Sequence, residues 1–480
     1  MRPLEIAVAV VLLPYVLHLL SPSQGDSLVF SLLPLIAALL VVCQVVVEGY
    51  RWQMVPAYCL TIVIVAYECT RWFWVFRAPY YAGAAALLFE FAAIALGTAL
   101  PIFKLPTPTG PYKIGTEIRH LIDESRRDPF SDNSGGAREL MIQIWYPVDP
   151  SVEGLAAPYR DRRITTLWDA RFAQVKSHAI IGGQLPQSPS RYSLLLYTPS
   201  WNGIRTESTF LVEELASHGY IVVGIDHPYS SRITVFPDGR IARRKFSGEE
   251  DYSSQVVFEA FLKTADQQVE IRARDAKFVL DTLERLNAND PQGLLTGRLD
   301  LTRVGIFGSS LGGTTAAQVC WLDRRFKAGV DLGGMVTGES AKQGTFAPFL
   351  FMFEGLYEDF IFGSSLSPET ELSGLSSSKR REVEFEWNQF AEMKQSLSTY
   401  GGYWMVIRGI KHVNYFDAPF YSPWRFSRVD PAHISTLIRR HVLAFFDKNL
   451  KGINRPLLDG SSPDFPEVRL QVWKAKAPVT

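Results

Sequence analysis

The chain has 480 residues, enough for two or three domains, and its 49 Lys and Arg residues balance 49 Asp and Glu residues. The chain has neither the surplus of basic residues that is typical of nucleic-acid-binding proteins nor an acidic tail. We therefore expect no nucleic-acid partner. Of the four cysteines only Cys320 follows residue 104, so the second part of the chain cannot form an internal disulfide bond.

The first part of the chain is rich in apolar residues. Leu28–Val47 is an almost unbroken apolar run of about twenty residues, the length that crosses the ~30 Å hydrocarbon core of a bilayer. Similar runs at 4–20, 54–70 and 81–103 flank it. The first run has no clear small-residue cleavage site after it, which favours a retained helix over a signal peptide. We therefore predict a multi-pass transmembrane region over residues 1–104, with about four helices in a bacterial cell membrane and its orientation left open.

Two acidic residues, Glu68 and Glu90, lie in or near the predicted spans. A carboxylate inside a membrane is a functional hypothesis by default, because its charge is costly in hydrocarbon. We favour a structural interpretation, in which Glu68 lies at the membrane interface beside Arg71 and Glu90 is protonated or paired between helices.

A Pro-rich segment at 104–112 ends the last span and starts the second part of the chain. There, short apolar runs typical of strands alternate with helical patterns, which predicts a mostly parallel sheet with helices on both faces, an α/β fold. The expected strands are 140–146, 192–197, 220–225, 303–307, 327–332, 349–353 and 403–407, and the expected helices are 207–218, 256–286, the run after Ser310, and 432–449. We assign 105–455 to a catalytic domain and 456–480 to a C-terminal tail. Sites in such sheets lie at the carboxyl ends of the strands.

The residues Gly308-Ser309-Ser310-Leu311-Gly312 form a G-x-S-x-G motif between a predicted strand and a predicted helix. A serine held on so sharp a turn leaves no room for side chains two residues to either side, which explains the glycines. A bare motif arises by chance in about one chain in ten of this length, so its surroundings must support it. Ser310 is the candidate nucleophile.

Titratable residues that could work with Ser310 follow later strands of the predicted sheet. Asp331 lies in or just after the next strand, Glu354 follows the one after, and His412 comes after the last strand. The order serine, acid, histidine along the chain is the order in α/β-hydrolases. His412 would accept the Ser310 proton and return it to the leaving alcohol, while a carboxylate orients its imidazole ring. The other histidines, such as His227 on a turn before a proline, have structural explanations.

Several segments of the second part match, in order, those of a known family. They are Trp145-Tyr146-Pro147, Leu215-Ala216-Ser217-His218-Gly219-Tyr220-Ile221-Val222, Asp226-His227-Pro228, the Ser310 motif, His412-Val413-Asn414-Tyr415-Phe416-Asp417 and Ala444-Phe445-Phe446-Asp447. Over about residues 105 to 450 the chain thus resembles the plasma, type II platelet-activating factor acetylhydrolases, which are α/β-hydrolases. The resemblance implies an α/β-hydrolase fold and calcium-independent hydrolysis of a short or oxidised acyl ester, typically at the sn-2 position of a phospholipid. We accordingly expect no cofactor, no metal ion, an ester or phospholipid substrate, and membrane lipid as a partner.

The resemblance also proposes the remaining site residues. The oxyanion hole would use the backbone N–H groups of Leu311 and Trp201, although relatives carry a His-Gly pair before the latter position. Relatives place their acid in a Leu-Asp-Gly turn, and an ungapped match puts Gly333 in that position. Asp331 precedes this position by two residues, and Glu354 ends the following strand. We favour Asp331 as the acid and keep Glu354 as the alternative.

These features predict a membrane-anchored serine hydrolase that cleaves a short-acyl or phospholipid ester through an acyl-enzyme on Ser310. Two alternatives remain. The missing Leu-Asp-Gly acid would suit a catalytically impaired, hydrolase-like binding protein, and the same acyl-enzyme could serve an acyltransferase. The long insertion at 355–400, with a Ser-rich piece at 364–378 and a charged helix at 382–394, could form a lid or a solvated surface helix.

Overall fold

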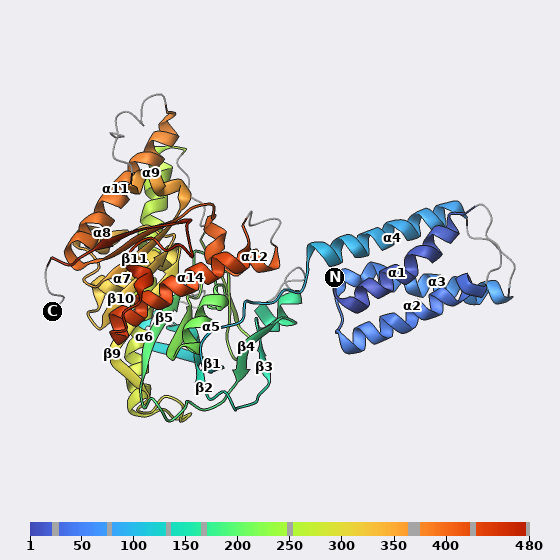
Figure 1. The fold of residues 1–480 in the computed structure, drawn as a ribbon, viewed down its shortest axis with the longest axis horizontal. Helices are drawn as coiled ribbons and strands as arrows, with labels where there is room; N and C mark the ends of the chain where they lie inside the picture. Colours follow the sequence, from blue (N-terminus) through green and yellow to red (C-terminus); the bar gives the residue numbers. More distant parts are fainter. Residues whose placement is uncertain are drawn as a thin grey trace. The chain divides into compact units, whose positions relative to one another are not determined.

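A computed structural model describes residues 1–21, 28–73, 79–130, 136–164, 170–246, 253–362, 375–422 and 429–476 (Figure 1). The chain divides into two compact units. One consists of Met1–Lys104 with Leu167–Val175, and the other of Leu105–Thr166 with Lys176–Thr480.

The first unit is helical. Its helices α1 (Pro3–Leu19), α2 (Leu28–Val47), α3 (Val55–Phe73) and α4 (Tyr80–Ala99) pack as neighbours in the order α2, α1, α4, α3, and α2 also contacts α3. Among the described residues, three helical segments are long and apolar enough to cross a membrane, namely Leu28–Val47, Trp52–Arg71 and Tyr80–Ala99. The expected fourth span, α1, is apolar but has only 17 residues. At 1.5 Å per residue such a helix reaches about 26 Å, short of the ~30 Å core.

Charged residues inside this helical unit are mostly paired. Glu5 is fully buried and forms an ion pair with Arg51 at 2.8 Å. Glu68 accepts a hydrogen bond from the Tyr15 hydroxyl at 2.5 Å and pairs with Arg71 at 3.1 Å, in agreement with the structural interpretation of this carboxylate. Glu90 is also buried, and its carboxylate oxygens have no hydrogen-bond partner in the part of the chain that the structure describes.

The second unit is built on a mixed sheet of 11 strands in the order β13-β12-β11-β10-β9-β5-β6-β2-β1-β4-β3. The six central strands, β12 through β6 in that order, are parallel to one another. Their bounds are β5 Tyr192–Thr198, β6 Tyr220–Asp226, β9 Leu299–Ser309, β10 Phe326–Leu332, β11 Phe349–Glu354 and β12 Gly402–Ile407. The outer strands are β1 Lys113–Arg127, β2 Ala137–Val148, β3 Ala156–Pro158, β4 Lys176–Ile181 and β13 Val468–Trp473, and a separate hairpin joins β7 Ile233–Val235 to β8 Ile241–Arg243.

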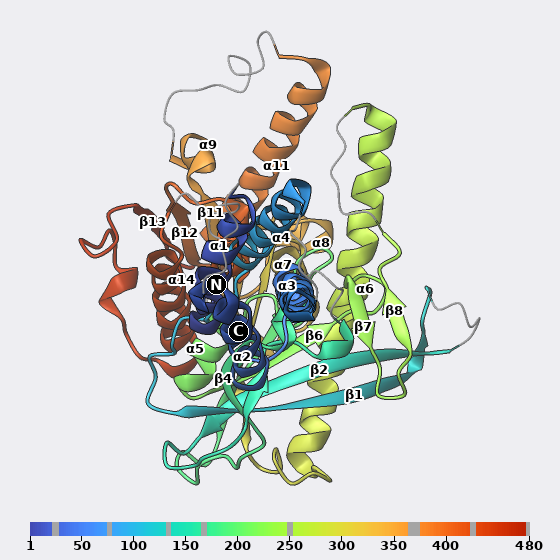
Figure 2. The same cartoon turned by 90° about the vertical axis from the view of Figure 1, so that its right-hand side faces the viewer.

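Helices cover both faces of this sheet (Figures 1 and 2). On one face α5 (Thr209–Ser217) packs against α14 (Pro431–Phe446), and on the other α6 (Gln255–Ala288) packs against α7 (Leu311–Leu322) and α8 (Gly338–Gln343). Shorter helices α9 (Glu358–Phe362) and α12 (Ala418–Tyr421) and the long α11 (Ser377–Tyr400) follow the later strands. Because the central strands are buried on both faces, they consist mostly of apolar residues. This arrangement confirms the predicted α/β-hydrolase fold.

Two strands differ from the sequence-based expectation. Residues 456–480, expected as a tail, contribute β13, which pairs antiparallel with β12 and completes the sheet edge. The sequence analysis missed the 15-residue β1, because several polar side chains of this strand are buried and several apolar ones are exposed. Its buried positions include Arg119, which forms two hydrogen bonds with Asp290 at 2.8 and 2.9 Å, whereas Ile118 and Ile122 are half exposed. Only tertiary contacts make such a pattern stable.

Candidate active site

Ser310 lies on a sharp turn between β9, which ends at Ser309, and α7, which begins at Leu311. Its φ of 54° and ψ of −125° are strained for a residue with a side chain. The turn holds this conformation through hydrogen bonds: the Ser310 N–H donates to the Leu332 carbonyl at 2.9 Å, and the Ser310 carbonyl accepts from the Gly313 N–H at 2.7 Å.

The glycines of the motif are required by close backbone approach. A Cβ atom on Gly308 would lie 2.2 Å from the backbone of Gly312, and one on Gly312 would lie 2.1 Å from the Thr198 carbonyl oxygen at the end of β5. Both distances are far below van der Waals contact. The turn can therefore form only with glycine at these two positions, as the motif predicts.

His412 contacts Glu354, and not the acid favoured from the sequence. Its Nδ1 atom lies 2.8 Å from Glu354 Oε1, at the end of β11, and the Glu354 side chain is 3% exposed. Asp331 instead accepts a hydrogen bond from the Gly334 N–H at 2.7 Å. A Cβ atom on Gly313 would lie 1.7 Å from Asp331 Oδ1, so this carboxyl group fills the space beside the first turn of α7. The structure therefore brings Glu354, the alternative acid, to His412, whereas the carboxyl group of the favoured Asp331 lies beside Gly313 and Gly334.

Position 333, where the resemblance places the acid of relatives, faces His412. A Cβ atom on Gly333 would lie 3.0 Å from His412 Nδ1 and 2.7 Å from the ring of Tyr415, which is fully buried. The Tyr415 ring therefore occupies the space that a side chain at position 333 would need. Glu354 reaches the same nitrogen atom from the neighbouring strand.

One cavity of about 430 Å³ brings the predicted groups together. Ser310, Leu311, Trp201 and His412 line it, along with Glu354. Its volume lies within the range of about 300–1,000 Å³ that is usual for small-molecule sites. The remaining walls are largely apolar and come from α6, α11 and the segments after β10 and β11. They include Phe261, Leu262, Met335, Leu356, Tyr357 and Phe385. The predicted insertion at 355–400 thus lines the cavity, while most of its Ser-rich piece lies outside the described residues.

The proposed oxyanion groups come from the start of α7 and from the loop after β5. Leu311 is the first residue of α7, where backbone N–H groups have no acceptor within the helix. The Trp201 ring stacks on Phe261 with centroids 5.8 Å apart, so this side chain also forms a wall of the cavity.

Two buried charged residues hold the Trp201 loop, and the sequence analysis missed both. Arg272 on α6 donates from Nη1 to the Pro199 carbonyl and from Nη2 to the Ser200 carbonyl, each at 2.9 Å. Glu207 accepts from the Ser200 N–H and, at 2.9 Å, from the Ser200 hydroxyl. A charged residue on the apolar face of a helix was the available signal for Arg272.

We expect Arg272→Lys to lower kcat by about tenfold to a hundredfold with little change in KM, because one ammonium group cannot hold two carbonyl groups as a planar guanidinium does. Steady-state kinetics on an acetyl ester measures this effect. Arg274→Lys, on the exposed face of the same helix, is the matched control. Equal losses in both variants, or a change in KM alone, would contradict a positioning role.

Asp331 makes stability depend on pH. Burial, with a further contribution from the Glu354 charge, raises the pKa of the Asp331 carboxyl well above its usual value. Between the unfolded-state pKa of about 3.9 and the raised value, the folded chain binds a proton that the unfolded chain has released, so stability falls as pH rises. We expect the melting temperature of Asp331→Asn, relative to the wild type, to increase as pH rises from about 4 to about 8. A constant difference across this range would contradict the prediction.

A second histidine–carboxylate pair lies in the core beneath the site. His227 Nδ1 is 2.9 Å from Asp275 Oδ2, and its Nε2 is 3.0 Å from the Thr198 hydroxyl. Burial lowers the pKa of His227 to about 4, so this ring is neutral at physiological pH. Both ring nitrogens are engaged, which agrees with the structural explanation given for this histidine.

Comparisons with known proteins point to esterases. The sequence pattern of a family described as "Platelet-activating factor acetylhydrolase, isoform II" matches residues 100–361. A protein of Arthroderma benhamiae named "Probable 1-alkyl-2-acetylglycerophosphocholine esterase" is 24% identical over 78% of this chain and 96% of its own length. A "Platelet-activating factor acetylhydrolase" of Cavia porcellus is 23% identical over 48% of this chain and 55% of its own length. A solved ferulic acid esterase of Streptomyces cinnamoneus is similar over 78% of this chain and 100% of its own, with 29% identity and a TM-score of 0.59.

Proposed function

Because the chain belongs to the platelet-activating factor acetylhydrolase, isoform II, family and is a carboxylic ester hydrolase, we propose that Ser310 is its nucleophile. In this proposal His412 is the general base, and Glu354 is the acid that orients it. The observation that carries the proposal is the 2.8 Å contact between His412 Nδ1 and Glu354 Oε1, in a cavity that Ser310 also lines.

The proposed reaction has two steps, the formation of an acyl-enzyme on Ser310 and its hydrolysis. The Ser310 hydroxyl attacks the ester carbonyl as His412 accepts its proton, and Glu354 keeps the other imidazole nitrogen protonated and stabilises the imidazolium. The backbone N–H groups of Leu311 and Trp201 face the oxyanion that develops. His412 then protonates the leaving alcohol, and a water molecule, activated by the same histidine, releases the acid.

We propose a short-acyl or phospholipid ester as the substrate. The name of the Arthroderma benhamiae relative describes an esterase for an acetylglycerophosphocholine, and that of the Cavia porcellus relative describes an acetylhydrolase. The cavity combines apolar walls with a few polar groups. Acyl transfer to an alcohol would use the same acyl-enzyme. Identifying the products formed with and without an added alcohol distinguishes hydrolysis from acyl transfer. The non-catalytic alternative rested on a missing acid, and Glu354 now supplies a carboxylate at His412.

A fluorophosphonate probe tests the nucleophile directly. The full chain, purified in detergent, is incubated with the probe and with p-nitrophenyl acetate. We expect the wild type to be labelled and to release nitrophenol, and Ser310→Ala to do neither. If the alanine variant is labelled as strongly as the wild type, the proposed nucleophile is wrong.

We also propose that the helical unit anchors the hydrolase in a membrane, since its three long apolar helices suit a lipid environment and would keep the enzyme near lipid substrate. We expect the full chain to stay in the membrane pellet after washing with concentrated salt and with alkaline carbonate, which remove proteins held only by surface charge. Release of the intact chain into the supernatant would contradict anchoring.

A further inference from the structure

One wall of the ester cavity is aromatic. The rings of Trp201 and Phe261 both line the cavity, and their planes differ by only 21° at a centroid distance of 5.8 Å. Phe258, one turn before Phe261 on α6, continues this series, with its plane within 20° of that of Phe261 and the centroids 6.5 Å apart. We call these residues, Trp201, Phe261 and Phe258, the aromatic row. Because its rings are nearly parallel, the row forms a flat surface.

The aromatic row extends from the Trp201 loop to α11. Phe385 on α11 also lines the cavity and meets the Phe258 ring edge-on, with centroids 5.3 Å apart and planes at 85°. Trp201, Phe261 and Phe385 are each only partly buried, as expected for rings that face a cavity. These rings are therefore available for contact with a substrate.

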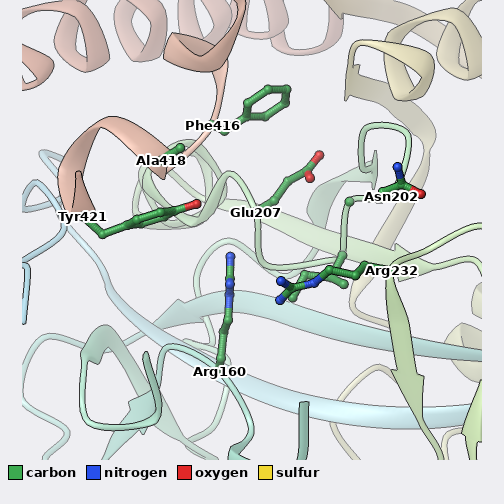
Figure 3. Close-up of a pocket in the computed structure, with 9 residues that line it drawn as sticks. Arg160, Asn202, Glu207, Arg232, Phe416, Ala418 and Tyr421 are labelled. Atoms are coloured by element: carbon green, nitrogen blue, oxygen red, sulfur yellow. The ribbon is translucent and has the colours of Figure 1, made fainter. Parts of the chain in front are cut away.

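A smaller cavity next to the Trp201 loop has the opposite character (Figure 3). It measures about 190 Å³, and Asn202, which directly follows Trp201, lines it. Figure 3 shows the charged side chains of Arg160 and Arg232 in this cavity, pointing toward one another. Burying an apolar group against charged side chains gains little, because it removes water from the charges. An apolar acyl group therefore suits the ester cavity and not this smaller one.

The ester cavity is much larger than an acetyl group requires. An apolar cavity of about 150 Å³ accepts a benzene ring. The ester cavity measures about 430 Å³, so it has room for an aromatic ring together with the ester group. An acetyl group alone would leave the aromatic row without contact, and surfaces that make no contact contribute no dispersion energy to binding.

The proposed chemistry of Ser310 decides which part of the ester faces the aromatic row. The leaving alcohol must lie at His412, which protonates it, and the carbonyl oxygen must lie at the N–H groups of Leu311 and Trp201. The first ring of the row belongs to Trp201 itself. The group attached to the carbonyl carbon on the acyl side is therefore the part of the substrate nearest to the row.

A planar aromatic acyl group suits this wall better than a flexible alkyl chain does. Aromatic rings prefer offset-stacked or edge-on contacts with other rings, and such contacts add to the free energy of apolar burial. A ring conjugated with the ester carbonyl is already planar and rigid, so it loses little conformational entropy on binding. An alkyl chain of the same size must restrict several rotatable bonds to lie on the same surface.

We propose that the aromatic row binds the acyl group of the substrate and that the protein hydrolyses esters of planar aromatic acids, of the benzoyl type. The inference rests on the proposed function and adds to it this substrate class. The Ser310 oxygen forms a bond to the aroyl carbon, and the bond from that carbon to the alcohol oxygen breaks. The Ser310 proton passes through His412 to the leaving alcohol, and water then releases the aromatic acid from the acyl-enzyme.

The first measurement compares methyl benzoate with methyl heptanoate on the full chain in detergent. Their acyl groups have the same number of carbon atoms, and methanol is too small a leaving alcohol to occupy the aromatic row. Each kcat/KM is corrected for partition of the ester into detergent and divided by the rate constant for hydrolysis by hydroxide. We expect this normalised value to be about threefold or more higher for the benzoate. An equal or lower value for the benzoate would overturn the proposal.

Variants on α6 and α11 separate aromatic contact from side-chain size. We expect Phe261→Leu and Phe385→Leu each to lower the benzoate-to-heptanoate ratio by about threefold to tenfold, and Phe261→Tyr, which keeps the ring, to hold it within about twofold. Phe278→Leu is the matched control, because this α6 ring packs under Arg126, with the guanidinium carbon 6.0 Å from its centroid. A ratio that is unchanged in both cavity variants, or lowered equally in the control, would contradict the proposal.

Boronic acids test the acyl side without a leaving group. The Ser310 oxygen would bond to boron while its proton passes to His412, which leaves a tetrahedral, negatively charged boronate whose substituent takes the place of the acyl group. We expect phenylboronic acid to inhibit p-nitrophenyl acetate hydrolysis with an inhibition constant about threefold or more below that of hexylboronic acid, and this preference to be lost in Phe261→Leu. Equal inhibition of the wild type by both acids would overturn the proposal.

The two levels of the argument fail separately. Absence of hydrolysis of every ester, p-nitrophenyl acetate included, would defeat the proposed function. Hydrolysis of p-nitrophenyl acetate and methyl heptanoate that depends on Ser310, without a preference for the benzoyl group, would leave the proposed function in place and defeat the aromatic acyl site.

Discussion

Replacing Ser310 with alanine is expected to lower kcat by about a million-fold, the loss typical of removing the nucleophile of a serine hydrolase. We expect a residual rate from substrate binding and from the proposed oxyanion groups at Leu311 and Trp201, which the substitution leaves in place. Hydrolysis of p-nitrophenyl acetate by the detergent-purified chain, corrected for the uncatalysed rate, measures the effect.

The neighbouring serine provides the control for this substitution. Ser309 is buried at the end of β9, where its hydroxyl lies 3.3 Å from that of Ser208 and does not line the cavity. We expect Ser309→Ala to keep kcat within about threefold, since it removes a buried hydroxyl group that does not line the cavity. Comparable losses of kcat in Ser309→Ala and Ser310→Ala would show that activity depends on the structure of this turn and not on the Ser310 hydroxyl group.

The second large effect is expected at Glu354. Glu354→Gln should lower kcat by about ten-thousand-fold, because an amide neither stabilises the imidazolium of His412 nor enforces the required tautomer. Asp331→Asn should keep kcat within about tenfold, because Asp331 bonds the Gly334 N–H and the amide oxygen of asparagine can accept the same bond. Parallel kinetics on the two amide variants, which change size very little, compares the acids directly.

Two outcomes would contradict this assignment. A greater loss in Asp331→Asn than in Glu354→Gln would return the role of acid to Asp331. If Glu354 acts through His412 and Ser310, the Ser310→Ala/Glu354→Gln variant should be no slower than Ser310→Ala alone, because the residues act as one unit. A further loss in the double variant would indicate that Glu354 affects activity by another route.

Residues close together in the chain determined much of the fold and part of the candidate site. The sharp turn at Ser310 could be predicted because its glycines are required by contacts within that turn and with the end of the adjacent strand. The buried parallel strands were predicted because burial on both faces leaves only apolar residues in them. The apolar runs before residue 104 predict membrane spans by their length. The helix α1, with 17 residues, is shorter than the length that crosses a membrane.

The sequence by itself therefore determined a parallel α/β domain with a serine elbow, a histidine at the same sheet edge, and an apolar helical region before it. Only the tertiary structure decided that Glu354 contacts His412, because Asp331 turns into the space beside Gly313 and the ring of Tyr415 fills the space at position 333. The same holds for Arg272, which bonds the loop before Trp201, and for the Arg160 and Arg232 side chains, which point toward one another in Figure 3. Each depends on which distant side chains share a space, and such contacts leave no periodic pattern in the chain.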